Sequence, residues 1–265
     1  MSVWPEPSSP PSDDESSTLL PKLGTPYANA GNPEILEMPA RIKAHLARIQ
    51  KQDRFSDAIR DIDWSFQCVE IDPLLAFQIH IGGARSTFLG DDLPDGCSPK
   101  HLVAKCLPQH QEAIRPKTVE ARGAFSGSYS LEAPTRNLQF RDTGLFETGV
   151  QDQYVMGALV GVASPFVQVM RFEGRCYLTN GYHRALAASK KGATHIPCIF
   201  GDTKAFRRTG AGQEGSLPRE LFESDNAPTV GHYTGQRATA LQLKRFATKI
   251  EVTWEVSFPE LVEQA

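Results

Sequence analysis

The chain has 265 residues, of which 40% are hydrophobic and 22% are charged, and its formal net charge at pH 7 is -3. This length suits one good-sized domain, or one domain with appendages. The slightly acidic balance argues against a broad nucleic-acid-binding surface, and no apolar run approaches the length of about 18 residues that a membrane span needs.

The cysteines are an odd set without a C-x-x-C pair, and the N-terminus lacks the apolar core of a signal peptide. Buried, reduced thiols in a soluble cytoplasmic protein are expected from this pattern, with no membrane partner. The five cysteines are Cys68, Cys97, Cys106, Cys176 and Cys198.

Three segments follow from the composition along the chain. Residues 1–30 are rich in proline and serine, which predicts a disordered tail because such a segment buries little apolar area. Residues 31–62 space apolar side chains three, four and seven apart, which predicts one or two amphipathic helices. Residues 63–265 are expected to form the main domain with a C-terminal extension.

Within the main domain, a strand is predicted from Trp64 to Ile81, and residues 84–117 are expected to be loop-rich. That loop contains four side chains of types that bind zinc. Their spacing does not match the paired cysteines of structural zinc sites, so scattered loop residues are the favoured interpretation. The four residues are Cys97, His101, Cys106 and His110.

Further along the chain, the patterns are weaker. A half-exposed strand is predicted at residues 125–131, turns at 137–148, and a short helix or packed turn at 155–162. Residues 204–215 are basic and glycine-rich, which predicts a mobile surface loop, with contact to phosphate or nucleic acid as the alternative. A helix at 238–248 and an alternating strand from residue 250 are expected to end the fold.

The most informative stretch runs from Phe166 to Asp202. It predicts a strand, a two-residue turn at Glu173-Gly174, a second strand, a polar loop, a helix that ends at Gly192, and a third strand. Such a strand–loop–helix unit is a frequent place for anion binding, because the amides of the first helical turn point out of the helix.

The polar loop joins the second strand to the helix and consists of Thr179, Asn180, Gly181, Tyr182, His183 and Arg184. Gly181 would allow a ligand to approach the backbone closely, and His183 and Arg184 could donate hydrogen bonds to phosphate oxygens. The residues alone leave two interpretations open: a phosphate site, or a capped helix with a surface His-Arg pair.

This stretch resembles the ParB/sulfiredoxin superfamily, in which a hairpin leads into a Gly-x-His-Arg or Gly-x-x-Arg signature, a helix and an I-P-V/C strand. The matching residues are Gly181-Tyr182-His183-Arg184 and Ile196-Pro197-Cys198. The resemblance covers about forty residues. It implies an α+β fold in which helices flank a mixed sheet, here with the N-terminal tail and an added C-terminal helix and strand.

The resemblance also implies a ligand, ATP or another nucleoside triphosphate with Mg²⁺, held at the signature loop. Tyr182 stands where sulfiredoxins carry their catalytic cysteine, and Asn180 where serine-kinase-like members often carry an acid. His183 stands where ParB proteins carry a second arginine, and no helix-turn-helix segment is apparent. The chain therefore departs from the best-known branches of the superfamily.

The candidate catalytic residues are Glu70 and His183, while the metal ligands stay unassigned. Glu70, Asp72 and Asp152 could each bind magnesium or act as a base, and each could equally be a surface carboxylate. Glu70 is preferred because the family places functional acids near its first strand.

The resulting hypothesis is a nucleotide-binding protein, with phosphotransferase or NTP hydrolase as the candidate activity. One alternative is a non-catalytic module that senses a nucleotide or another small molecule and acts through a protein partner. Another is a DNA-associated regulator of the ParB type, which the acidic balance disfavours.

Overall fold

The computed structural model describes residues 17–22, 27–59, 62–82, 89–109, 126–133, 138–147, 150–151, 154–162, 164–212, 216–224, 226–234, 237–242 and 248–255. The chain falls into two compact units, residues 1–111 with 164–244, and residues 112–163 with 245–265. The segments expected from composition, with boundaries after residues 30 and 62, follow a different division. Each unit combines pieces that are distant in the sequence.

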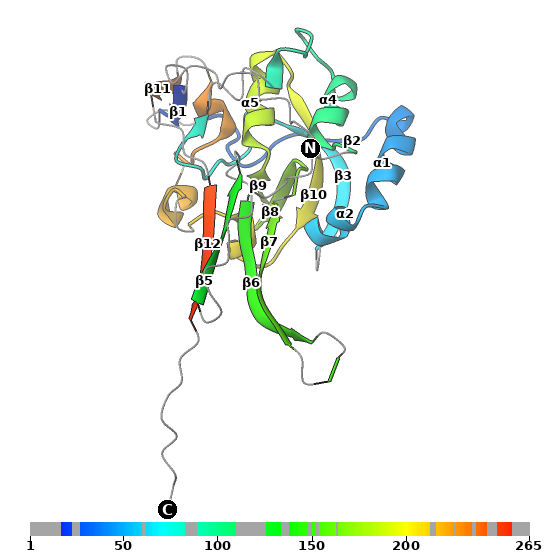
Figure 1. Cartoon of the computed structure of the whole chain (residues 1–265). Coiled ribbons are helices and arrows are strands. Elements are labelled where there is room, and N and C mark those ends of the chain that lie inside the picture. Colours follow the sequence, from blue (N-terminus) through cyan, green and yellow to red (C-terminus); the bar gives the residue numbers. More distant parts are fainter. Residues whose placement is uncertain are drawn as a thin grey trace, which may run out of the picture. The chain divides into compact units, whose positions relative to one another are not determined.

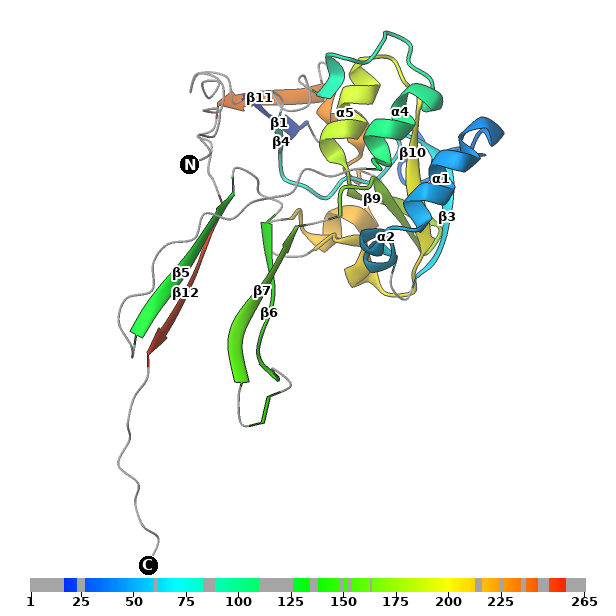
Figure 2. The ribbon, with the colours of Figure 1, turned by 45° about the vertical axis from the view of Figure 1, so that its right-hand side comes forward.

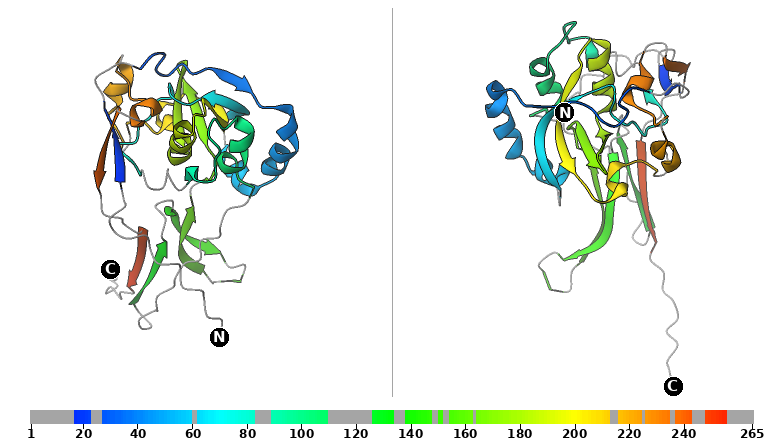
Figure 3. Two further views of the ribbon diagram at one scale, coloured as in Figure 1. Left: turned by 90° about the horizontal axis from the view of Figure 1, so that it is seen from above. Right: turned by 180° about the vertical axis from the view of Figure 1, so that it is seen from behind.

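The first unit is a mixed α+β structure around a five-stranded sheet (Figure 1). Its strand order is β2 (Ile35–Glu37), β3 (Asp63–Glu70), β10 (His195–Asp202), β8 (Gln168–Phe172) and β9 (Arg175–Asn180). Only β10 and β8 run parallel, and the other neighbours are antiparallel. Figure 3 shows β3 in cyan beside β10 in yellow. The predicted α+β class with a mixed sheet is confirmed.

The β8–β9 hairpin forms as predicted, and local backbone geometry explains why. Glu173 and Gly174 have φ angles of 49° and 78°, the two positive values that a tight hairpin turn requires. The helix α5 (Tyr182–Lys190) then leads to β10, and Gly192 follows the helix with a φ of 76°. A glycine in this left-handed conformation ends many helices.

The described residues of this unit also form the helices α1 (Lys43–Gln50), α2 (Asp53–Ala58) and α4 (Pro99–Cys106). The first two confirm the predicted amphipathic segment, although β2 and the 3-10 turn η2 (Ala40–Ile42) precede them. The prediction of a loop-rich segment at residues 84–117 is wrong for the residues that form α4. Ser98 caps this helix and Pro99 occupies its first turn, both of which favour a helix start.

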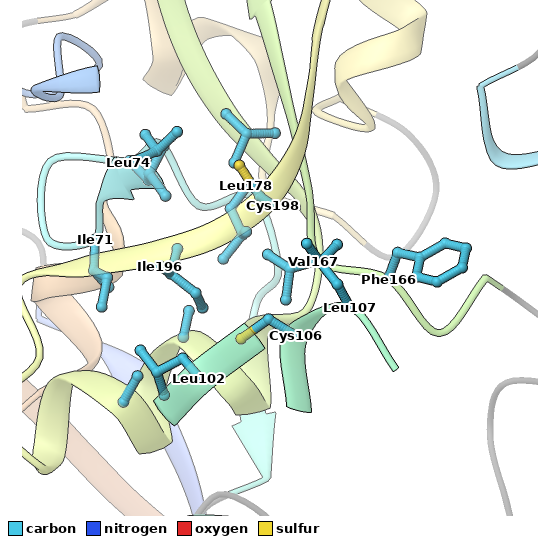
Figure 4. Packing of buried hydrophobic residues seen from close by; sticks show 14 of the residues in the cluster. Ile71, Leu74, Leu102, Cys106, Leu107, Phe166, Val167, Leu178, Ile196 and Cys198 are labelled. Atoms are coloured by element: carbon cyan, nitrogen blue, oxygen red, sulfur yellow. The ribbon is translucent and has the colours of Figure 1, made fainter. Parts of the chain in front are cut away.

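The hydrophobic core lies between the sheet and helices α4 and α5, which are neighbours in Figure 2. Figure 4 shows Leu102 and Cys106 of α4 close to Ile196 of β10, with Val167 nearby. These four side chains have at most 1% of their surface exposed. Burial of such apolar side chains is the main stabilising contribution to the fold.

A three-stranded sheet overturns two expectations about the ends of the chain. Its strands are β11 (Ala238–Gln242), β1 (Ser17–Pro21) and β4 (Ile81–Gly82). Part of the predicted disordered tail is thus a strand, and the first half of the predicted C-terminal helix is a strand as well. Each pairs with the other over five residues, so tertiary pairing overrides the tail's composition and the local helix propensity.

The described residues of the second unit form two antiparallel pairs of strands. The strand β5 (Ser126–Ala133) pairs with β12 (Thr248–Glu255), which confirms both predicted strands. The other pair is β6 (Leu138–Glu147) with β7 (Tyr154–Val162), so the turns and the short helix predicted there are wrong. Gly144 lies opposite Gly157, and glycine-rich strands of this kind carry a weak strand signal.

The basic, glycine-rich segment after β10 is ordered where the structure describes it. It forms the 3-10 turn η3 (Phe206–Thr209), and the ring of Phe206 lies 5.5 Å from that of Phe172. The described residues form such turns again at η4 (Arg219–Glu223) and η5 (Val230–Tyr233). In the part of the chain that is described, no helix combines the length and apolar character needed to cross a membrane.

Candidate functional site

The polar loop forms the junction between β9 and α5, and Gly181 is its central residue. Gly181 is buried at the N-cap of α5 with a φ of 103°. A Cβ atom at this position would lie 2.7 Å from Cγ2 of Val167, which is closer than real Cβ contacts. Both the backbone conformation and the close packing therefore require glycine here.

The first turn of α5 directs its amides toward the junction. The Arg184 and Ala185 amides both donate to the Gly181 carbonyl, at 3.0 and 2.9 Å, and these bonds open the helical ladder. The N–H groups before them lie at the positive end of the helix dipole. The first turn contains no acidic side chain that would compete with a bound anion.

Arg184 is directed at backbone carbonyls rather than away from the fold. Its Nη1 donates to the carbonyls of Lys105 and Cys106, at 3.3 and 3.5 Å, and to the carbonyl of Pro165. Lys105 and Cys106 form the C-terminal turn of α4, where a cation is favourable. In this conformation Arg184 ties α5 to α4 and to the segment before β8.

The Tyr182 side chain points into the hydrophobic core. Only 2% of its surface is exposed, and its hydroxyl oxygen accepts a 3.0 Å hydrogen bond from the Phe77 amide. Burial raises the pKa of Tyr182 well above its ordinary range. The Tyr182 side chain therefore anchors the helix and is not available for contact with a ligand.

His183 lies on the other side of the first turn, beside the end of β4. It is half-buried, and a Cβ atom built on Gly82 would lie 3.1 Å from its Nε2. An imidazole at a helix N-terminus can donate to an oxyanion or shuttle a proton. The imidazole chemistry of His183 suits either role at this end of the helix.

Thr179 and Asn180 hold the junction together from the strand side. Thr179 Oγ1 donates to the Gln168 carbonyl at 3.2 Å. Asn180 Nδ2 donates to the carbonyls of Ser164 and Phe166, at 2.6 and 2.8 Å. Both side chains thus fix the loop against the start of β8, so their observed role is positioning.

The carboxylates proposed for catalysis lie at the opposite end of α5. Glu70 pairs in register with His195, just after the helix, and its Oε2 accepts from the Glu34 amide at 3.0 Å. Asp72 accepts from Ser189, in the last turn of α5, at 3.0 Å. The structure does not bring Glu70 and His183 together, and Asp152 lies outside the described residues.

The described members of the cysteine and histidine cluster, Cys97, His101 and Cys106, do not form a metal site. Among the described residues, no three histidine, cysteine or acidic side chains are arranged to hold a metal. His101 Nδ1 accepts from the Ser98 amide at 3.2 Å and so caps α4, while burial raises the pKa of Cys106 to about 12. Cys97 is also buried, and His110 lies outside the described residues.

Comparison with known proteins adds no relative, because no family model, curated protein or solved structure matches the chain. Several groups at the junction were not predicted from the sequence, because only the folded chain brings them there. They are Val167, Gly82 and the carbonyls of Lys105, Cys106 and Pro165. The Ser98-Pro99 pair was the one local signal that could have revealed α4.

Proposed function

We propose that the protein binds the phosphate groups of a nucleoside triphosphate, together with Mg²⁺, at the N-terminal end of α5. The observation that carries the proposal is the buried, left-handed Gly181 between β9 and α5, followed by two basic residues and no acid in the first turn. This is the arrangement by which strand–glycine–helix units bind phosphate. The mixed sheet around it is compatible with the ParB/sulfiredoxin resemblance.

The first-turn residues have different roles in this proposal. The backbone amides and His183 contact phosphate oxygens, and Tyr182 anchors the helix through Phe77. Arg184 adds positive charge at the site while its Nη1 bonds the carbonyls of α4. It is therefore a positioning residue. Its removal would weaken the link between α5 and α4 and would also reduce the positive electrostatic potential at the site.

We propose nucleotide binding as the primary function. Transfer or hydrolysis of the phosphate would be a further activity of the same site. A phosphoryl-transfer site needs a base and metal ligands near the phosphates. Glu70 and Asp72 are at the other end of α5, so a base would have to come from His183 or from residues beyond those described. A sensing module without catalysis fits the same geometry.

Calorimetric titration of the full chain with ATP, CTP and GTP, with and without Mg²⁺, tests the proposal. The decisive variant is His183→Glu, which places a carboxylate in the first turn, where it favours the helix but repels phosphate. The variant should keep its melting temperature and lose binding. Lys190→Gln, at the other end of the same helix, is the matched control and should bind like the wild type.

A nucleotide at 100 times its dissociation constant should also stabilise the wild type by about 2.7 kcal/mol. Absence of heat and of stabilisation with all three nucleotides would refute the proposal. Unchanged binding by His183→Glu would move the site elsewhere. Release of phosphate or of a phosphorylated product then distinguishes an enzyme from a sensor.

A further inference from the structure

The two edges of the five-stranded sheet differ in whether other segments of the chain hydrogen-bond to them. At the β9 edge, the Leu75 amide donates to the Cys176 carbonyl and the Leu178 amide to the Leu75 carbonyl, both at 2.9 Å. The Cys176 amide donates to Gly31 at 2.7 Å. At the other edge, β2 pairs with β3 alone among the described residues (Figure 1).

The register of β2 determines which of its backbone groups face outward. The Glu70 amide donates to the Glu34 carbonyl at 2.9 Å, so Glu34 faces β3. Backbone direction alternates along an antiparallel strand, and Leu36 therefore also faces β3, opposite Cys68. The N–H and C=O groups of Ile35 and Glu37 consequently point away from the sheet, toward an added strand.

The side chains of β2 are exposed in a way that edge strands usually avoid. Ile35 and Leu36 are 37% and 42% exposed, although both are large and apolar. Carboxylates flank them, since Glu37 is exposed and the Glu34 side chain is 63% exposed. Short length and charge protect such edges from aggregation, but they do not require adjacent exposed isoleucine and leucine side chains.

We propose that β2 binds an extended segment of a partner protein, which adds an antiparallel strand to the sheet and carries the pattern basic–apolar–apolar–basic. Two hydrogen-bonding residues, Ile35 and Glu37, accept and donate the main-chain bonds. In an antiparallel pair, side chains directly opposite each other interact, and opposite charges are favourable. The basic residues thus lie opposite Glu37 and Glu34, with the apolar pair opposite Leu36 and Ile35.

Charge complementarity decides between this partner and a second copy of the chain. A two-fold pairing of β2 with itself would gather the carboxylates of Glu34 and Glu37 from both copies along one seam, and this concentration of negative charge is unfavourable. His195 Nε2, 3.3 Å from Glu34, relieves this only when protonated. Pro33 and Pro39 flank the strand, which limits the added segment to a few residues.

Fluorescence anisotropy with labelled peptides tests the proposal on the full chain. A peptide with the core Lys-Val-Ile-Arg should bind, and one with Glu-Val-Ile-Glu should not. N-methylation of the Lys and Ile amides removes the donors that face β2 and should weaken binding at least about tenfold. N-methylation of the Val amide, which faces away, is the control and should leave binding unchanged.

A charge swap on the protein gives a second test. The variant Glu37→Lys should bind the basic peptide about fivefold more weakly and gain affinity for the acidic peptide. Glu220→Lys makes the same charge change on η4 and should have no effect. Equal binding of all peptides, or of both N-methylated forms, would overturn the proposal. So would a dimer in sedimentation that Glu37→Lys strengthens, because a second copy would then be the occupant.

Discussion

The two ends of α5 differ in how the protein completes them. At the C-terminal end, the Gly96 amide donates to the Lys191 carbonyl at 2.6 Å, and Lys191 forms an ion pair with Asp95 at 3.2 Å. Asp72 binds Ser189 in the last turn. Protein groups therefore satisfy this end of the helix, as expected for a structural terminus.

At the N-terminal end, the described side chains hold the helix in position. They do not neutralise the positive end of its dipole. Gly181 is packed against Val167, and Arg184 points across to carbonyls of another helix. No acidic side chain occupies the first turn. Protein groups thus complete one end of α5, whereas the other end keeps its positive pole, where we propose that a phosphate binds. Four measurements test this difference between the two ends of the helix.

The largest effect is expected from Gly181→Ala. The added Cβ would lie 2.7 Å from Val167 Cγ2, in a backbone conformation with a φ of 103°. Strain and overpacking together should lower the free energy of unfolding by about 3 kcal/mol, measured by urea denaturation.

The matched control is Gly192→Ala at the other end of the helix. Its φ is 76°, but the nearest atoms to an added Cβ are backbone atoms of Gly96 at 3.7 Å, an ordinary contact. Only conformational strain remains, and the loss should be about 1 kcal/mol. Equal losses at the two glycines would show that Val167 relaxes and that the packing at Gly181 is not restrictive.

The next effect concerns Arg184→Met, which preserves most of the volume of the side chain and removes its charge. The carbonyls of Lys105, Cys106 and Pro165 would each lose a donor, and of these Cys106 keeps its 2.8 Å bond from the Val167 amide. Hydrogen bonds from a charged group justify a loss of about 2 kcal/mol in the free energy of unfolding. Hydrogen exchange should also become faster at the end of α4, and an unchanged exchange rate there would contradict the tie between α4 and α5.

A smaller effect is expected at the C-terminal end from Ser189→Ala. The hydroxyl donates to Asp72 at 3.0 Å, and its loss should lower the free energy of unfolding by about 1 kcal/mol. Nucleotide binding should be unaffected because Ser189 is in the last turn of the helix. If the variant lost binding instead, the two ends of α5 would not be independent.

The smallest effect appears only at alkaline pH and involves Tyr27, which donates to Asp72 at 2.9 Å. Burial and this carboxylate raise the pKa of Tyr27 from 10.0 to about 12. The unfolded phenol loses its proton first, so this stabilisation is complete below pH 10 and decreases as pH rises toward 12.

The variant Tyr27→Phe removes this titration while other tyrosines still contribute. The decrease in the free energy of unfolding between pH 10 and 12 should therefore be smaller in the variant than in the wild type. Denaturation at several pH values measures both slopes. Identical slopes would show that Tyr27 ionises as easily in the folded protein as in the unfolded chain.

The features of the fold that depend on neighbouring residues could be predicted from the amino-acid sequence. The β8–β9 hairpin follows from Glu173-Gly174, and the end of α5 follows from Gly192, because both positions need positive φ angles. The role of Gly181 as the residue between strand and helix was predictable for the same reason. These signals are local, so they can be recognised without knowing which distant residues pack against them.

Features that depend on pairing between distant segments could not be predicted from the sequence and become visible in the folded chain. The strands β1 and β11 form because segments near the two ends of the chain pair with each other, which no local pattern reveals. The carbonyls that bind Arg184 come from α4 and from Pro165, and the helix length places Glu70 away from His183. A side chain's chemistry is written in the sequence, but its partners depend on which surfaces the packed core brings together.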